Sequence, residues 1–285
     1  MARNNVGETG LGRRRSHHRD HRELDMKRIQ DLYYVLLRKL LGPGLPHETE
    51  GTGQSAVLLS RVGLLEDRVH HLEDRLMSYY RNRWDAIDNL ADYLVGAEVP
   101  GDYVEFGVYK GVTFGYALKI MSSLFPKMKF IAFDSFEGLP EPKGIDRTED
   151  YSSNFYKGQF ACSESEFMAL LAQQNVDLQK VVTVKGWFHD VLKDHLSENL
   201  GPDVIAAAWI DCDLYESTVP VLDFIGPRLS TGSVLLFDDW GCFRNLPDFG
   251  QQRACSEWLV ANPHITLDPL FPFAWHGKAF TVRLS

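Results

Sequence analysis

Short apolar runs alternate with helical patterns through the second third of the chain and beyond. Five of these runs are rich in β-branched and aromatic residues and begin at Tyr103, Phe130, Val181, Ile205 and Val234. Each run stops at a polar or acidic residue. Strands separated by helical segments are typical of βαβ units in an open, mostly parallel sheet. Ligands of such sheets bind beyond the carboxyl ends of the strands, so we expect the five run ends to converge on one site.

The pattern divides the chain into three parts. Residues 1–25 predict a disordered basic tail, and residues 99–285 predict the α/β domain. Between them, residues 26–98 predict a helical N-terminal region that is expected to contact substrate and a second subunit. At the far end, the chain from Ile265 predicts a turn rich in proline and phenylalanine, followed by a last strand over Ala279–Val282.

The helical region contains two different apolar patterns. Leu32–Leu41 predicts a short amphipathic helix that ends at glycine and proline. Farther on, a seam of apolar residues alternates spacings of four and three, as in heptads: Leu58, Val62, Leu65, Val69, Leu72, Leu76 and Tyr79. The seam pairs with a second copy of the chain or lies on the α/β domain. We expect a homo-oligomer.

Composition narrows the classes of partner. Apolar residues make up 44% of the chain, which suffices for a core, and the formal net charge of −9 disfavours nucleic acid. No uncharged apolar run approaches the roughly 20 residues that a membrane helix needs. The basic cluster at Arg13–Arg15 fits a nucleic-acid arm or a solvated tail, and we favour the tail. Four cysteines without CxxC spacing suit a reducing cytosol, so we expect a cytoplasmic protein.

A glycine loop follows the first strand. Its pattern, Glu105-x-Gly107-x-x-x-Gly111, precedes a helical segment over Thr113–Ser122. Glycines allow a tight turn and a close approach of the backbone to a ligand. The loop lacks the first glycine pair of the dinucleotide fingerprint and matches the E/D-x-G-x-x-x-G loop of S-adenosylmethionine (SAM) enzymes. The alternative is a purely structural turn.

The next two strand ends extend the nucleotide hypothesis. Asp134 ends the second run, where a carboxylate can accept hydrogen bonds from both ribose hydroxyls of an adenosine. A turn or helix cap is the alternative. Trp187 and Phe188 follow the third run and offer flat surface for an adenine, although a core role fits them equally well.

Acidic residues gather after the fourth and fifth runs. Asp211, Asp213, Asp238 and Asp239 would crowd one spot if these strands are neighbours, and a cation would offset their repulsion. A carboxylate-rich set suits Mg²⁺, Ca²⁺ or Mn²⁺. Asp213 fits equally well as a helix cap together with Glu216.

An aromatic group lies downstream of the acids and is either core or the wall of an acceptor site: Phe243, Phe249, Phe271, Phe273 and Trp275. His276 beside it is a weaker candidate for a general base.

Five strings in order resemble the macrocin O-methyltransferase (TylF/MycF) family, whose members are SAM-dependent enzymes that methylate sugar hydroxyls of natural products with a magnesium ion. The strings are Val104–Gly111 (VEFGVYKG), Phe133–Pro140 (FDSFEGLP), Lys185–Phe188 (KGWF), Asp211–Thr218 (DCDLYEST) and Phe237–Gly241 (FDDWG). The resemblance implies a class I SAM-dependent methyltransferase fold with a doubly wound, mostly parallel seven-stranded sheet and an N-terminal helical extension.

The resemblance and the strand-end pattern together give the expected site. SAM is expected to contact Glu105, Gly107, Val108, Gly111, Thr113, Asp134, Ser135, Phe136, Gly186, Trp187, Phe188 and Asp211. Mg²⁺ or Mn²⁺ is expected on Asp211, Asp238 and Asp239. Asp211 or His276 would take the proton of the acceptor, a hydroxyl of a glycosylated natural product.

Two rival functions remain at this point. A nicotinamide oxidoreductase shares the glycine loop and Asp134 but has no use for the acidic cluster. A non-catalytic assembly module built on the heptad seam leaves Asp238 and Asp239 unexplained. Leu32–Leu41 and the stretch after Gly241 also depart from the family pattern, which leaves the acceptor open.

Overall fold

The computed structural model describes residues 53–147, 155–192 and 201–285, with side chains from Val62 onward. The expected basic tail and the Leu32–Leu41 helix lie outside this range. The chain divides into two units, Met1–Met77 and Ser78–Ser285. The long helix α2 (Gly53–Gly96) contributes to both.

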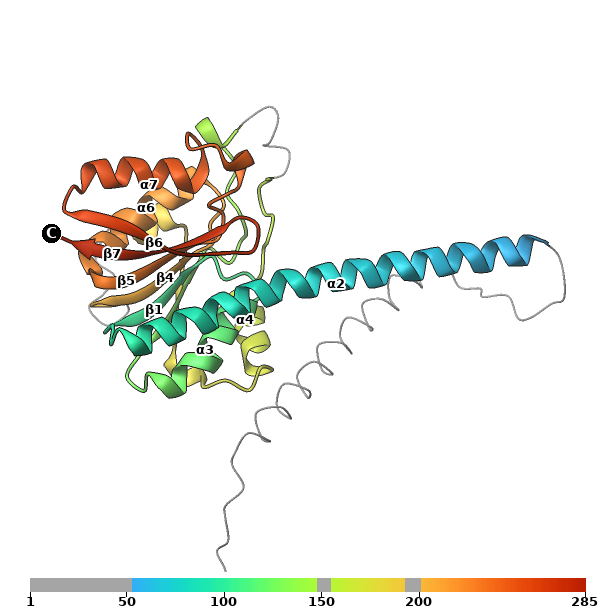
Figure 1. Ribbon diagram of the computed structural model, residues 1–285, viewed down its shortest axis with the longest axis horizontal. Coiled ribbons are helices and arrows are strands. Elements are labelled where there is room, and N and C mark those ends of the chain that lie inside the picture. The colour runs from blue at the N-terminus through green and yellow to red at the C-terminus, as the bar shows by residue number, and fades with distance from the viewer. Residues whose placement is uncertain (1–52, 148–154, 193–200) are drawn as a thin grey trace, which may run out of the picture. The chain divides into compact units, whose positions relative to one another are not determined.

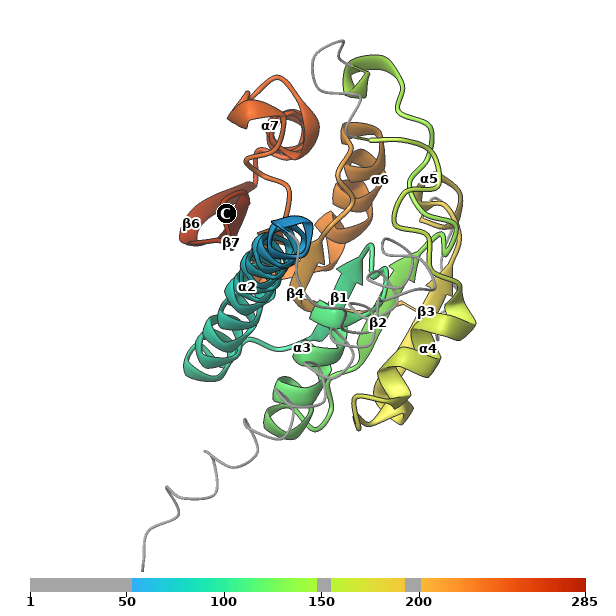
Figure 2. The same ribbon diagram turned by 90° about the vertical axis from the view of Figure 1, so that its right-hand side faces the viewer.

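A seven-stranded sheet forms the centre of the second unit, in the order β3-β2-β1-β4-β5-β7-β6 (Figures 1 and 2). The strands are β1 (Asp102–Phe106), β2 (Phe130–Asp134), β3 (Val181–Lys185), β4 (Ile205–Ile210), β5 (Leu229–Phe237), β6 (Ile265–Phe273) and β7 (Gly277–Leu284). The first five run parallel, and β7 is antiparallel to both β5 and β6. The mostly parallel sheet is confirmed, and so is the adjacency of the fourth and fifth strands.

Helices cover both faces of the sheet, which accounts for the almost continuous apolar runs of the central strands. The remaining helices are α3 (Val112–Leu124), α4 (Glu164–Ala172), α5 (Phe188–Val191), α6 (Tyr215–Ile225) and α7 (Gly250–Ala261), with single turns η1 (Gly144–Asp146), η3 (Leu178–Lys180), η4 (Gly226–Arg228) and η5 (Phe243–Asn245). One core cluster joins the sheet to α2, α3 and α4, and a second joins it to α5, α6 and α7. The doubly wound architecture is therefore confirmed.

The two halves of α2 differ in burial. From Ala86 to Leu94 its apolar face belongs to the core, with Ile87, Leu90 and Leu94 at 0% exposure. In the first unit the predicted seam is open to solvent, since Leu65, Leu72 and Leu76 are 45%, 62% and 43% exposed.

The expected proline-rich turn at the C-terminal end is wrong. Ile265–Phe273 forms strand β6, although it contains Pro269 and Pro272. Proline is tolerated there because β6 lies at the edge of the sheet, where one side of the strand needs no ladder hydrogen bonds. The last strand expected over Ala279–Val282 is confirmed as part of β7.

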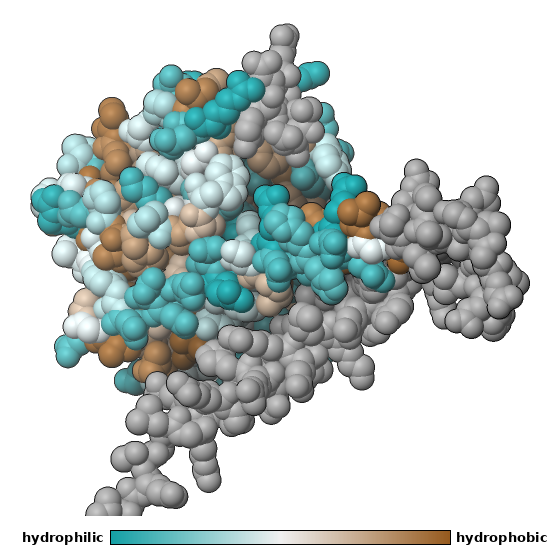
Figure 3. Space-filling model, turned by 45° about the vertical axis from the view of Figure 1, so that its right-hand side comes forward, coloured by the Kyte–Doolittle hydropathy of each residue, from teal (hydrophilic) through white to brown (hydrophobic). Residues whose placement is uncertain are grey.

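Three further findings concern the helices, the surface and the cysteines. Within the described ranges, no helix is both long and apolar enough to cross a membrane. Hydrophilic and hydrophobic side chains are interspersed on the face shown in Figure 3. All four cysteines are free and buried.

Candidate active site

The carboxyl ends of the five parallel strands open into one pocket of about 620 Å³, a size typical of small-molecule sites. Glu105, Asp134, Gly186, Asp211 and Asp238 each bring one strand end to its wall. The wall also includes all but two of the other expected site residues: Gly107, Val108, Thr113, Ser135, Trp187, Phe188, Asp239 and His276. Gly111 and Phe136 are not among the wall residues.

Close packing requires glycine at both Gly107 and Gly111 of the loop. A β-carbon on Gly107 (φ +86°) would lie 1.9 Å from the carbonyl oxygen of Asp211, so the end of β1 can approach β4 only without a side chain. A β-carbon on Gly111 (φ +70°) would lie 2.8 Å from the ring of Phe167, which also packs on Phe136. The structural alternative therefore explains both glycines, while the backbone between them lines the pocket.

Asp134 ties the end of β2 to the glycine loop. Its Oδ2 accepts hydrogen bonds from the backbone N–H groups of Val108 (2.8 Å) and Tyr109 (3.3 Å), and its Oδ1 accepts one from Phe136 (2.6 Å). Burial raises the pKa of Asp134 while these hydrogen bonds lower it. The carboxylate of Asp134 therefore stabilises a turn, which was the alternative to ribose binding. The two roles are compatible, because Oδ1 has a further lone pair for a ribose hydroxyl.

Glu105 is buried within strand β1, just before the glycine loop. The hydroxyl of Tyr103 donates to its carboxylate at 2.6 Å. Burial raises the pKa of Glu105 to about 8, so the side chain is largely protonated at neutral pH. A neutral carboxyl at this position can donate a hydrogen bond as well as accept one.

Phe188 has a core contact as well as a place in the pocket wall. It is the first residue of α5, and its ring meets that of Phe106 edge-on with centroids 5.8 Å apart. Trp187 precedes the helix and is half-buried. Of the two aromatic residues, Trp187 is the more available for an adenine.

Three of the four acids form one cluster. Carboxylate oxygens of Asp211, Asp213 and Asp239 lie within 4.8 Å of one another, and the N–H of Asp213 donates to Oδ2 of Asp239 at 2.9 Å. Burial and the neighbouring carboxylates raise the pKa of Asp211 and Asp239 well above their usual range, and burial and Asp238 raise that of Asp213 to about 7. Such an oxygen-only cluster can bind a hard divalent cation.

The fourth acid, Asp238, is paired with an arginine side chain. Its Oδ2 forms a salt bridge with Nη2 of Arg83, and the two side chains are 1% and 4% exposed. The Arg83 guanidinium lies 3.6 Å from the centre of the Tyr79 ring. Oδ1 of Asp238 and Nη1 of Arg83 have no hydrogen-bond partner within the described structure.

The capping role considered for Asp213 is wrong. Helix α6 begins at Tyr215 after Leu214, which makes no side-chain cap. Asp146 caps the helix from η1 by accepting from the N–H groups of Tyr215 (2.8 Å) and Glu216 (3.0 Å). Asp213 is unsuited to the cap because its backbone is left-handed (φ 56°), which turns it toward the other acids.

His276 lies at the turn between β6 and β7 and is 7% exposed. Its Nδ1 hydrogen-bonds to the backbone carbonyl of Asp238. The aromatic residues expected beside it do not form one group. Phe243 and Phe249 stack in a small core cluster, whereas Trp275 is 72% exposed. None of these three lines the main pocket, so the acceptor wall expected from them is not formed there.

Helix α2 contributes residues to the pocket that were not among the expected site residues, although the helical region as a whole was expected to contact substrate. Tyr79, Tyr80 and Arg83 form part of its wall. The signal was present, since Arg83 follows Tyr79 by four residues and takes the next position of the heptad seam. A charged residue at an apolar position indicates a buried partner.

The fold and the loop define the class of protein. The sheet order, the glycine loop and an acid at the end of β2 are those of a class I SAM-dependent methyltransferase fold. The model of the macrocin-O-methyltransferase (TylF) family matches residues 77–262, and the chain belongs to this family. The family prediction made from the five strings is confirmed.

Two named enzymes and one crystal structure are similar to parts of this chain. A tetracenomycin-C derivative 4'-O-methyltransferase from Streptomyces olivaceus and demethyldecarbamoylnovobiocin O-methyltransferase from Streptomyces niveus are each 28% identical over 161 residues. The match covers 55% of this chain and 60% of each relative. The crystal structure of CalS11, a calicheamicin methyltransferase, shares the fold at 24% identity and a TM-score of 0.59, covering 84% of this chain and 98% of that one.

Proposed function

We propose that the protein is a SAM-dependent O-methyltransferase that methylates a sugar hydroxyl of a glycosylated natural product with the help of a divalent cation. The observation that carries this proposal is the pocket itself, in which the glycine loop and the carboxylate cluster share one wall. The named activities of the Streptomyces relatives support the substrate class. A nicotinamide oxidoreductase would leave the buried carboxylates without a role.

The donor set fits Mg²⁺ or Mn²⁺. All the donors are carboxylate oxygens, their mutual repulsion calls for a cation, and Oδ1 of Asp238 is buried without a partner. Asp211, Asp213 and Asp239 would hold the ion, and Asp238 would join them if it turned from Arg83. A bound cation would supply Lewis acidity and lower the pKa of the acceptor hydroxyl.

The chain's own residues would orient the reactants and accept the proton. Backbone groups of Gly107 and Val108, with the carboxylate of Asp134, would hold SAM in front of the acids. Asp211 or His276 would take the proton from the acceptor. A carbonyl only accepts, so the hydrogen bond to Asp238 places a proton on Nδ1 of His276 and leaves the lone pair on Nε2.

Binding of the demethylated product tests the cofactor assignment. Asp134→Ala is expected to weaken binding of S-adenosylhomocysteine by about 1.5 to 3 kcal/mol, the scale of hydrogen bonds to a charged group. Isothermal calorimetry measures the effect, with Asp223→Ala on the exposed face of α6 as the matched control. Clear binding of NADH without any heat from S-adenosylhomocysteine would contradict the proposal.

We further propose that the chain is a homo-oligomer that pairs through the seam of α2. The exposure of Leu65, Leu72 and Leu76 supports this, because a second copy would cover them. Changing both Leu65 and Leu72 to Lys is expected to yield a monomer of about 32.5 kDa in light scattering at micromolar concentration. As a control, Asp67 and Asp74, each two residues after a seam leucine, are changed to Lys, and this variant should remain an oligomer.

An unchanged oligomer in the leucine variant would place the subunit contact elsewhere. A monomeric wild-type chain would reject the oligomer itself.

A further inference from the structure

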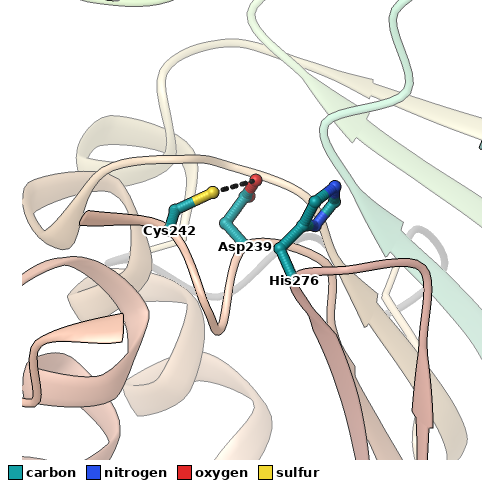
Figure 4. Close-up of side chains that lie close together, drawn as sticks. All are labelled: Asp239, Cys242 and His276. Atoms are coloured by element: carbon teal, nitrogen blue, oxygen red, sulfur yellow. Dashed lines mark hydrogen bonds between the residues drawn. The ribbon is translucent and has the colours of Figure 1, made fainter. Parts of the chain in front are cut away.

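A second group of metal-ligand residues lies beside the carboxylate cluster and shares one member with it. Ligand atoms of Asp239, Cys242 and His276 lie within 4.8 Å of one another (Figure 4). The three residues are 6%, 9% and 7% exposed. The Cys242 thiol points at Oδ1 of Asp239 with a sulfur–oxygen distance of 3.7 Å. One sulfur, one nitrogen and one oxygen donor are thus held together away from bulk water.

Backbone hydrogen bonds fix the two turns that carry these ligands. The N–H of Cys242 donates to the carbonyl of Asp239 (3.0 Å), and that of Gly241 donates to the carbonyl of His276 (2.7 Å). A β-carbon on Gly241 would lie 3.1 Å from Cα of His276, so the glycine permits the turns to meet. The ligands are therefore positioned before any ion arrives, which lowers the entropic cost of binding.

The histidine has the hydrogen bond that metal-bound histidines commonly make. Nδ1 of His276 hydrogen-bonds to the backbone carbonyl of Asp238, which fixes the orientation of the ring. Thiolate, imidazole and carboxylate donors form the ligand sets of Zn²⁺ and its neighbours in the first transition row. Mg²⁺ and Mn²⁺ prefer the oxygen-only cluster on the other side of Asp239.

We propose that Asp239, Cys242 and His276 form a binding site for Zn²⁺ or a similar borderline metal ion. On binding, a zinc–sulfur bond replaces the S–H bond of Cys242, and the thiol proton passes to solvent. Asp239 belongs to both groups, so an ion at this site draws the carboxylate away from the cluster. Zinc would then inhibit the magnesium-supported methyl transfer, a consequence that rests on the proposed function.

Cobalt titration tests the site without reference to turnover. Co²⁺ added to the metal-free protein is expected to give the thiolate-to-cobalt charge-transfer absorption that a sulfur ligand produces. Cys242→Ser should lose this absorption, whereas Cys255→Ser, which changes a buried cysteine in α7, should keep it. Absence of the band in the wild type, or an equal band in Cys242→Ser, would overturn the proposal.

Zinc inhibition of the Mg²⁺-supported reaction tests the shared carboxylate. The zinc concentration that halves each protein's own Mg²⁺-supported rate is expected to be about tenfold or more higher for Cys242→Ser than for the wild type. Equal sensitivity of the two proteins would refute the link between the sites. A protein that shows the cobalt band but transfers no methyl group would refute the proposed function and leave the zinc site standing.

Discussion

Asp239→Asn is expected to lower methyl transfer by at least about a hundredfold while leaving the affinity for S-adenosylhomocysteine within about twofold. The cluster is expected to work only with a cation, because two carboxylates about 4 Å apart repel by about 4 kcal/mol at an effective dielectric near 20. Asparagine removes one of the three charges that would hold the ion. The loss of several kcal/mol of Lewis-acid assistance corresponds to this change in rate.

Initial rates and calorimetry on the same preparations separate the two effects. Turnover that falls while product binding persists indicates a group that acts on the reaction rather than on the cofactor. Asp248→Asn, an exposed acid in the following loop, is the matched control and should behave as wild type. Excess chelator should abolish the wild-type reaction, and added Mg²⁺ or Mn²⁺ should restore it.

Activity without a metal ion would contradict the proposed role of the cluster. Full methyl transfer by a preparation shown to be metal-free, in excess chelator, would make the cluster structural. The proton would then have to be taken without a cation, with His276 as the remaining candidate.

The pocket was predictable because its parts are local. Each strand carries its own terminal polar residue, and a parallel sheet brings the ends together whatever the loops do. Asp134, Asp211, Asp239 and most of the glycine loop could therefore be placed from the sequence, and they line the pocket, with Gly111 as the exception.

The positions of Asp213 within the carboxylate cluster and of Asp238 beside Arg83 were not predictable from local pattern. Asp213 joins the cluster through a left-handed backbone conformation, which is uncommon for a residue other than glycine. Asp238 lies outside the cluster and pairs with Arg83, which is 155 residues away in the sequence. Tertiary contacts decide both outcomes, and the spacing of the acids contains no sign of either.

Strand β6 was not predicted for a related reason, because its prolines indicated a turn. Pro269 and Pro272 indicate a turn if the strand is central, and they are harmless if it lies at an edge. The position of β6 at the edge follows from the pairing of β7 with β5, which no local pattern encodes.

Arg83→Met is expected to lower the free energy of unfolding by about 3 to 5 kcal/mol. The substitution keeps an apolar stem of similar length but leaves the carboxylate of Asp238 buried without its cation, and breaking one side of a buried pair costs this much. Urea denaturation measures the loss. Arg81→Met, two residues earlier on the exposed side of α2, should change stability by no more than about 0.5 kcal/mol.

The double variant Arg83→Met with Asp238→Asn separates the pair from the packing of the arginine on Tyr79. If the cost of Arg83→Met arises from the unpaired carboxylate, Asp238→Asn should recover a large part of it, because the variant then buries no unpaired charge. A loss that persists in full would assign the effect to the lost contact with the Tyr79 ring. Equal stability of Arg83→Met and Arg81→Met would mean that Asp238 finds another partner when the arginine is removed.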